Sequence, residues 1–141
     1  MGTKTINPVS VALAGAKITK TDTGGTTGSI IVAPTTAQSS LNFSLNFEDL
    51  FVVVENYSTT ALCVVTVKAG DDYSEVGIGD TATITVATSS TIVIGGRELE
   101  SARFKDKYGY LNLDITSTAT CYVYAIMQPF TILNKKITNN P

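Results

Sequence analysis

Four carboxylates in a glycine-containing segment are the residues with the clearest potential for chemistry in this chain. They fall between positions 71 and 80 and are Asp71, Asp72, Glu75 and Asp80. Such oxygen ligands could bind calcium, and Asp71 with Asp80 could in principle serve as the acid and base of glycoside hydrolysis. Their spacing fits neither an EF-hand loop nor a glycine-rich nonapeptide repeat. We therefore interpret the segment as a solvated loop between strands, with calcium binding as the alternative, and we expect no cofactor.

The nucleophiles of the chain lack the base that would activate them. The sequence contains no His, which is the usual general base near neutral pH and the commonest metal ligand. Neither a nucleophile elbow, a phosphate loop nor a dinucleotide fingerprint is present. Cys63 and Cys121 each lie in an apolar, strand-like run, which is typical of buried thiols that pack as small hydrophobes. We predict that the chain is not an enzyme, and a disulfide between the two cysteines remains the alternative.

Charge is scarce and scattered. Charged residues make up 16% of the chain and the net charge is −2, against a usual charged share of about 25%. Binding to duplex DNA needs a clustered cationic face, and the densest basic pair here is Lys135 with Lys136. Nor does any apolar run approach the ~20 residues of a membrane-spanning helix. We expect neither nucleic acid nor a membrane as a partner.

Hydrophobic periodicity indicates an all-β fold. Thr, Val, Ile and Ser are abundant, and residues 81–86 alternate between polar and apolar. Leu111, Leu113 and Ile115 alternate in the same way. Strand-like runs recur every 8–12 residues or so, and the runs 51–56 and 61–68 are predicted to pair as a hairpin. The expected fold is an antiparallel β-sandwich or a jelly-roll-like barrel of about seven to eight strands.

The chain divides into three parts by composition. Residues 1–46 are rich in turn-forming residues with short apolar pieces, residues 47–129 carry the dense strand pattern, and residues 130–141 form a polar tail. We interpret the first part as an extended arm and the second as the sandwich body. An isolated arm of this composition has little to offset its ordering entropy. It is therefore expected to be held by the body or by a neighbouring chain.

Two groups of side chains are candidates for contact with a partner. In the first, Leu99 and Phe104 are predicted to plug one end of the sandwich while Arg103 pairs with Glu100. The alternative is that Arg103 and Phe104 anchor an interface, where both residue types are common. In the second group, Tyr122 and Tyr124 share one face of a strand. The candidate interface residues are Arg103, Phe104, Tyr122 and Tyr124.

The running order of strands and turns resembles the head decoration proteins of tailed phages, in their β-sandwich form. The resemblance covers roughly residues 51–127. It rests on a strand at 64–71, a loop containing 77–80, strands at 83–87 and 92–95, the segment 99–104, and Gly109 before the alternating strand. It is a pattern of strands and turns without catalytic residues. The arm of this chain is longer than in simpler members of the family.

The resemblance implies a non-enzymatic virion protein on the capsid surface, bound to the major capsid protein and often assembled as a homotrimer. Low charge and a rigid β core suit a part made in many copies. The competing interpretation is a secreted or surface β-sandwich, either a filament subunit or a carbohydrate-binding module. Because sandwiches host many functions, the fold by itself does not decide between these classes. A sugar binder usually displays Trp, and this chain has none.

Overall fold

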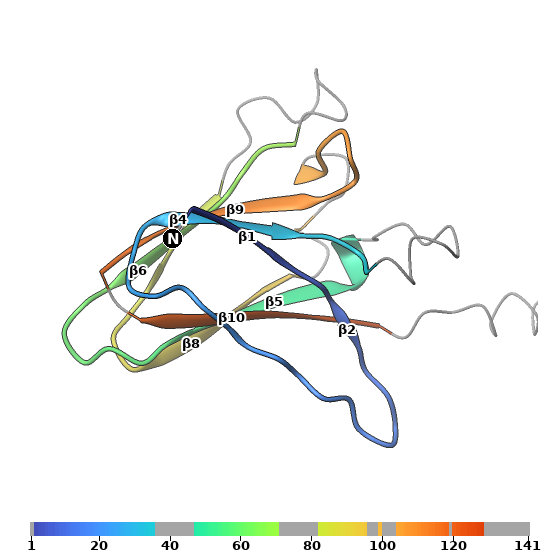
Figure 1. Ribbon diagram of the computed structural model, residues 1–141, viewed down its shortest axis with the longest axis horizontal. Helices are drawn as coiled ribbons and strands as arrows, with labels where there is room; N and C mark the ends of the chain where they lie inside the picture. Colours follow the sequence, from blue (N-terminus) through green and yellow to red (C-terminus); the bar gives the residue numbers. More distant parts are fainter. Residues whose placement is uncertain are drawn as a thin grey trace, which may run out of the picture.

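Two five-stranded sheets lie face to face in the computed structural model (Figure 1). The hydrophobic core lies between them. The structure describes residues 2–35, 47–70, 82–95, 99, 104–118 and 120–128. Sheet A has the order β1 (Gly2–Ile6), β4 (Gly28–Val32), β9 (Leu111–Ser117), β6 (Cys63–Val67), β7 (Ala82–Val86). Sheet B has the order β2 (Val9–Ser10), β10 (Cys121–Met127), β5 (Leu50–Asn56), β8 (Ser90–Gly95). The short strand β3 (Thr21–Asp22) also pairs with β10, and one 3₁₀ turn, η1 (Phe47–Asp49), leads into β5.

Alternation along each strand builds the core. In β9, the side chains of Leu111, Leu113 and Ile115 are fully buried, as their spacing predicts. In β10, Val123 is fully buried while the flanking tyrosines are only partly covered. Successive side chains of a strand point to opposite faces of its sheet. The buried rows of the two sheets therefore meet in one continuous core.

The predicted all-β sandwich is confirmed, with three differences in detail. The described residues form ten strands, and the two sheets do not close into a barrel. Two of the strand pairs are parallel, β1 with β4 and β2 with β10. All of the other pairs that join named strands are antiparallel. The additional strands and both parallel pairs come from residues 2–32, whose short apolar pieces become strands only when the body offers them a partner.

The predicted hairpin between residues 51–56 and 61–68 is wrong. β5 pairs with β10 and β8 in sheet B, whereas β6 pairs with β7 and β9 in sheet A. The connection between β5 and β6 therefore crosses from one sheet to the other. Both strands are apolar and close in sequence, and proximity alone predicts pairing. A crossing connection lets both strands bury their inward rows on opposite sides of the same core.

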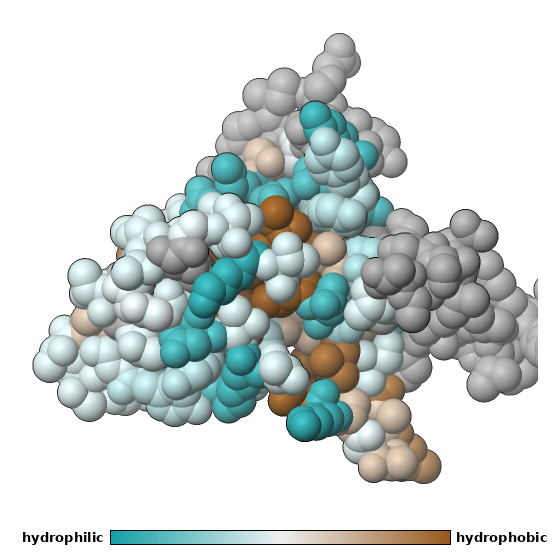
Figure 2. Space-filling model, in the orientation of Figure 1, coloured by the Kyte–Doolittle hydropathy of each residue, from teal (hydrophilic) through white to brown (hydrophobic). Residues whose placement is uncertain are grey.

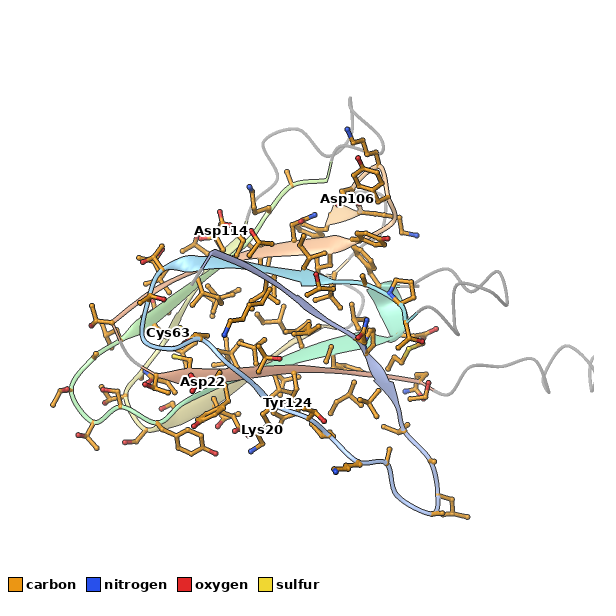
Figure 3. The ribbon with its side chains drawn as sticks, in the orientation of Figure 1. Lys20, Asp22, Cys63, Asp106, Asp114 and Tyr124 are labelled. Atoms are coloured by element: carbon orange, nitrogen blue, oxygen red, sulfur yellow. The ribbon has the colours of Figure 1, made fainter. Side chains whose placement is uncertain are left out.

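Residues 2–35 belong to the sandwich. β4 lies inside sheet A between β1 and β9, and its side chains Ile30 and Val32 are fully buried. β2 and β3 line the β10 edge of sheet B. The arm is expected to be held by the body or by a neighbouring chain. In this structure β2, β3 and β4 pair with strands of the body. The turn at 106–109 also forms as predicted, with Gly109 at positive φ and the Asp106 carboxylate accepting hydrogen bonds from two backbone N–H groups (Figure 3).

Candidate interaction surface

The outer face of sheet B carries apolar and aromatic side chains in three cross-strand rows. Residues paired across strands point to the same face of a sheet, so the register gives each row directly. The rows are Tyr122–Glu55–Thr91, Tyr124–Val53–Val93 and Ile126–Phe51–Gly95. We call these nine residues the aromatic face. Val93 is 62% exposed, and Tyr122, Tyr124, Phe51 and Ile126 are partly exposed.

The outer face of sheet A has the opposite character. Its longest row is polar throughout and consists of Thr3, Ser29, Asp114, Thr66 and Thr83. The Ser29 hydroxyl donates to the Asp114 carboxylate at 2.9 Å, and the Lys68 ammonium lies 3.8 Å from the same carboxylate. Asp114 lies on this side of the molecule in Figure 3. Antiparallel sandwiches usually present polar side chains to water on both outer faces. Only sheet A follows that pattern.

A carboxylate organises the polar corner of the aromatic face. Glu55 accepts a hydrogen bond at 2.8 Å from the Lys20 ammonium and one at 2.9 Å from the Tyr57 hydroxyl. Its second oxygen accepts from the Tyr124 hydroxyl at 3.1 Å. The Lys20 nitrogen also lies 5.7 Å from the centre of the Tyr124 ring, within the range of a cation–π contact. Lys20 and Tyr124 lie next to each other beside the lower sheet in Figure 3.

This network shifts the pKa values of Glu55, Lys20 and Tyr124. The hydrogen bond from Lys20 lowers the pKa of Glu55 below its ordinary value, against the opposing effect of burial. The same bond raises the pKa of Lys20. Burial, followed by the hydrogen bond to Glu55, raises the pKa of Tyr124. At neutral pH Glu55 and Lys20 therefore form a charged pair, and the hydrogen bonds that Glu55 accepts from Tyr57 and Tyr124 hold both aromatic rings in place.

A shallow hollow of about 400 Å³ adjoins this network. It is lined by Lys20, Tyr57, Thr120 and Tyr122. The Tyr57 and Tyr122 rings meet edge to face with their centres 5.2 Å apart. This edge-to-face geometry is a favoured one for aromatic pairs, and it leaves Tyr57 59% exposed. The corner thus combines exposed ring surface with an ammonium and a hydroxyl.

The residues predicted as interface anchors divide between core and surface. Tyr122 and Tyr124 lie together on the aromatic face, with Val123 turned inward as expected. Phe104 is 5% exposed and Leu99 is 3% exposed, both within the core. That placement agrees with the plug interpretation and leaves the Phe104 ring little surface for a partner. Arg103 and the acidic segment 71–80 lie outside the described residues, as does the expected pairing of Arg103 with Glu100.

Neither cysteine is in a disulfide and both are fully buried, as the favoured interpretation predicts. Sequence reasoning missed most of the aromatic face, including Phe51, Val53 and Val93. A signal was available, because residues 51–54 are apolar without alternation. A strand that is apolar on both sides is covered on both sides in most folds. Here the inner side meets the core, while on the outer side Phe51 is partly exposed and Val53 is covered to 6% exposure.

Comparison of the chain with protein-family models, with curated proteins and with solved structures finds no match. Among the described residues, no group of three or more His, Cys, Asp or Glu side chains is gathered where it could hold a metal ion. Within the same part of the chain, no helix has the length and apolar character needed to cross a bilayer. The candidate interaction surface is the aromatic face, with its partly exposed rings and the hydrogen bonds around Glu55.

Proposed function

We propose that this chain is a non-enzymatic structural protein of a virion, which decorates and stabilises a tailed-phage capsid through protein–protein contacts. The observation that carries the proposal is the contrast between the two outer faces of the sandwich. Sheet A presents a hydrogen-bonded polar row, whereas sheet B presents tyrosines, Phe51, Val93 and Ile126. Contiguous apolar surface rimmed by polar groups marks a contact site in soluble proteins.

The composition of the aromatic face suits a protein partner. Tyr and Phe are enriched at the centres of protein interfaces and charged residues are depleted there. In this face the one ionised side chain, Glu55, is already neutralised by Lys20 at 2.8 Å. Docking a partner over it therefore buries an existing pair instead of an isolated charge, which reduces the desolvation cost.

The specific partner is proposed from the resemblance of residues 51–127 to β-sandwich decoration proteins. That resemblance implies the major capsid protein as the surface that is bound and the virion exterior as the location. The strands of a sandwich are joined by hydrogen bonds and by a shared core, which suits a protein that reinforces a shell from outside. The aromatic face is the side that we place against the capsid.

The test is to locate the chain on native particles. Antibodies raised against the recombinant protein are used for immunogold electron microscopy of particles and cells from its biological source. Label on capsid heads is expected. Label confined to cell surfaces or to filaments, with bare heads, would overturn the proposal in favour of a secreted or surface module.

A binding measurement then tests the aromatic face. Rebinding to heads stripped of this protein is compared for the wild type and for a variant with both Tyr122→Ala and Tyr124→Ala. Buried aromatic anchors contribute about 2 kcal/mol or more each, so the double substitution should cost about 4 kcal/mol and the affinity is expected to fall roughly 700-fold. Thr66→Ala on the outer face of sheet A is the matched control and should bind like the wild type. Equal loss in both variants would contradict the assignment of the face.

The alternative function, a surface carbohydrate-binding module or filament subunit, has one observation in its favour. The hollow beside Tyr57 and Tyr122 offers ring surface together with the Lys20 ammonium and the Thr120 hydroxyl. Sugar rings stack on such surfaces and hydrogen-bond at their edges. Titration of immobilised polysaccharides with the wild type and with Tyr57→Ala distinguishes this function from capsid binding.

A further inference from the structure

The loop between β2 and β3 projects from the β10 edge of sheet B, and its first six residues are apolar. Between β2 and β3, residues 11–16 read Val-Ala-Leu-Ala-Gly-Ala and all are exposed. Leu13 exposes its whole side chain and Val11 is 42% exposed. The tip is a tight turn, in which the Gly15 N–H donates to the Ala12 carbonyl at 2.9 Å and Gly15 has positive φ. We call residues 11–16 the apolar knob, and it extends beyond both layers at the lower right of Figures 1 and 2.

A groove whose described lining is apolar lies on the opposite side of the sandwich. It has a volume of about 370 Å³ and opens between the edge strands β7 and β8. Its lining consists of Val67, Ala82, Ile84, Ile92, Val93, Ile94, Gly95, Leu99 and Phe104. Among the described residues of this lining, none has an ionisable side chain. Leu99 and Phe104 form its floor from the core, and Ala82 lies exposed at its mouth.

The strands that border the groove are open edges. Among the described strands, β7 pairs only with β6 and β8 only with β5. Neither strand contains a charged residue or a proline. Native edge strands are usually protected by charge, proline or a covering element, because an open edge pairs readily with another chain. The groove and its borders thus have the features of a surface that is covered in the assembled protein.

We propose that the groove receives the apolar knob of a second copy of this chain. The knob and the groove match in chemistry, since residues 11–16 and the described lining of the groove are all uncharged, and apolar side chains predominate in both. They also lie at opposite edges of one sheet, because β2 and β8 are its two ends. Register places both toward the same end of that sheet, where Val9 aligns with Ile126, Phe51 and Gly95 in one row. Each copy therefore offers one knob and one groove to two different neighbours.

Such a contact is heterologous, and its geometry has a definite consequence. A knob on one edge and a groove on the other join copies head to tail, so the assembly either closes as a ring or continues as a filament. The contact uses neither Tyr122 nor Tyr124. Val93 belongs to both surfaces, and no substitution at that position is used in either test. The tests of this contact and of capsid binding are therefore independent, and one can fail while the other succeeds.

The test is complementation between two variants that each lose one half of the contact. Leu13→Glu places a charge on the knob and leaves the groove intact, and Ala82→Arg blocks the groove and leaves the knob intact. Both positions are exposed, so the fold is preserved, which thermal unfolding verifies. By light scattering at high protein concentration, the wild type should form rings or longer assemblies. Each variant alone should be monomeric, with self-association weakened roughly thirtyfold or more. The 1:1 mixture should form a heterodimer that cannot grow.

Matched controls separate the contact from general surface effects. Leu62→Glu changes another exposed leucine, 56% exposed in the loop between β5 and β6, and Thr83→Arg changes the neighbour of Ala82 on the outer face. Both should assemble like the wild type. A monomeric wild type, a mixture that does not pair, or assembly by Ala82→Arg alone would overturn the proposal. Co-sedimentation of a monomeric wild type with phosphatidylcholine vesicles, lost in Leu13→Glu, would instead assign the knob to a lipid surface.

Discussion

Replacing Asn56 with Ala should destabilise the sandwich more than any other single polar truncation that the structure suggests. Asn56 ends β5, is 2% exposed and sits where the two sheets approach each other. Its amide nitrogen donates to the carbonyl oxygens of Ala61, Val86 and Ala87 at 2.9, 3.2 and 3.2 Å. Its oxygen accepts from the Ser58 N–H at 3.0 Å. One side chain therefore joins sheet B to the connection before β6 and to the end of β7.

The expected loss follows from those four hydrogen bonds. A buried hydrogen bond contributes about 1 kcal/mol net, which gives about 4 kcal/mol if every partner is left unsatisfied. Carbonyl oxygens that keep another partner lose less, so the free energy of unfolding should fall by about 2–4 kcal/mol. Domains of this size are stable by about 5–15 kcal/mol in total. The variant should then melt about 8–16 °C lower.

Urea unfolding followed by circular dichroism measures the change, with thermal melting as the second probe. Asn112→Ala is the matched control, since its amide makes one hydrogen bond, at 2.8 Å to the Asp106 carboxylate. The free energy of unfolding of that control should fall by about 1 kcal/mol. A loss of less than about 1 kcal/mol for Asn56→Ala, or one no larger than that of Asn112→Ala, would refute the reasoning that the amide ties the two sheets together.

Three further outcomes are expected. Because the pKa of Glu55 is lowered in the fold, chiefly by Lys20, its contribution to stability is present above the unfolded pKa and is lost as pH falls through the folded one. Below neutral pH, the free energy of unfolding of Glu55→Gln should therefore fall less steeply with decreasing pH than that of the wild type. An unchanged dependence on pH would contradict the stabilising role of the Glu55–Lys20 pair. Gly70→Ala should cost more than about 2 kcal/mol in urea unfolding, since its methyl group would collide with the Lys105 backbone, whereas Gly109→Ala should cost only about 1 kcal/mol through its positive φ. The two buried thiols should resist a thiol reagent in the native protein and react together on denaturation, and rapid native labelling would show that the cysteine strands open independently.

The class of fold and the composition of the core are readable from the sequence because they depend on local alternation. Leu111, Leu113 and Ile115 alternate with polar residues, and all three are buried. The same reasoning places Tyr122 and Tyr124 on one outward face with Val123 inside. Turn chemistry is also local, and the turn before β9 forms where Gly109 allows it.

Pairing between strands is less predictable, because it depends on which partners compete for the same edge. β5 and β6 are neighbours in sequence and still enter different sheets. Residues 2–32 resemble loop in composition, yet β4 fills an interior position of sheet A with two fully buried side chains, Ile30 and Val32. A short apolar piece is a strand only if another strand supplies its hydrogen bonds, and that partner, β9, is about 80 residues away in the chain.

The sequence by itself determined that this protein is all-β, that its two thiols are buried and that Tyr122 and Tyr124 share one strand face. Each of these follows from the types of the side chains and from their alternation along a strand, and neither depends on how the strands are connected. Tertiary structure alone decided that the two outer faces differ in polarity and that the knob and the groove lie at opposite edges of sheet B. Those properties belong to rows and edges assembled from strands distant in sequence. They exist only once register and strand order are set by packing of the shared core.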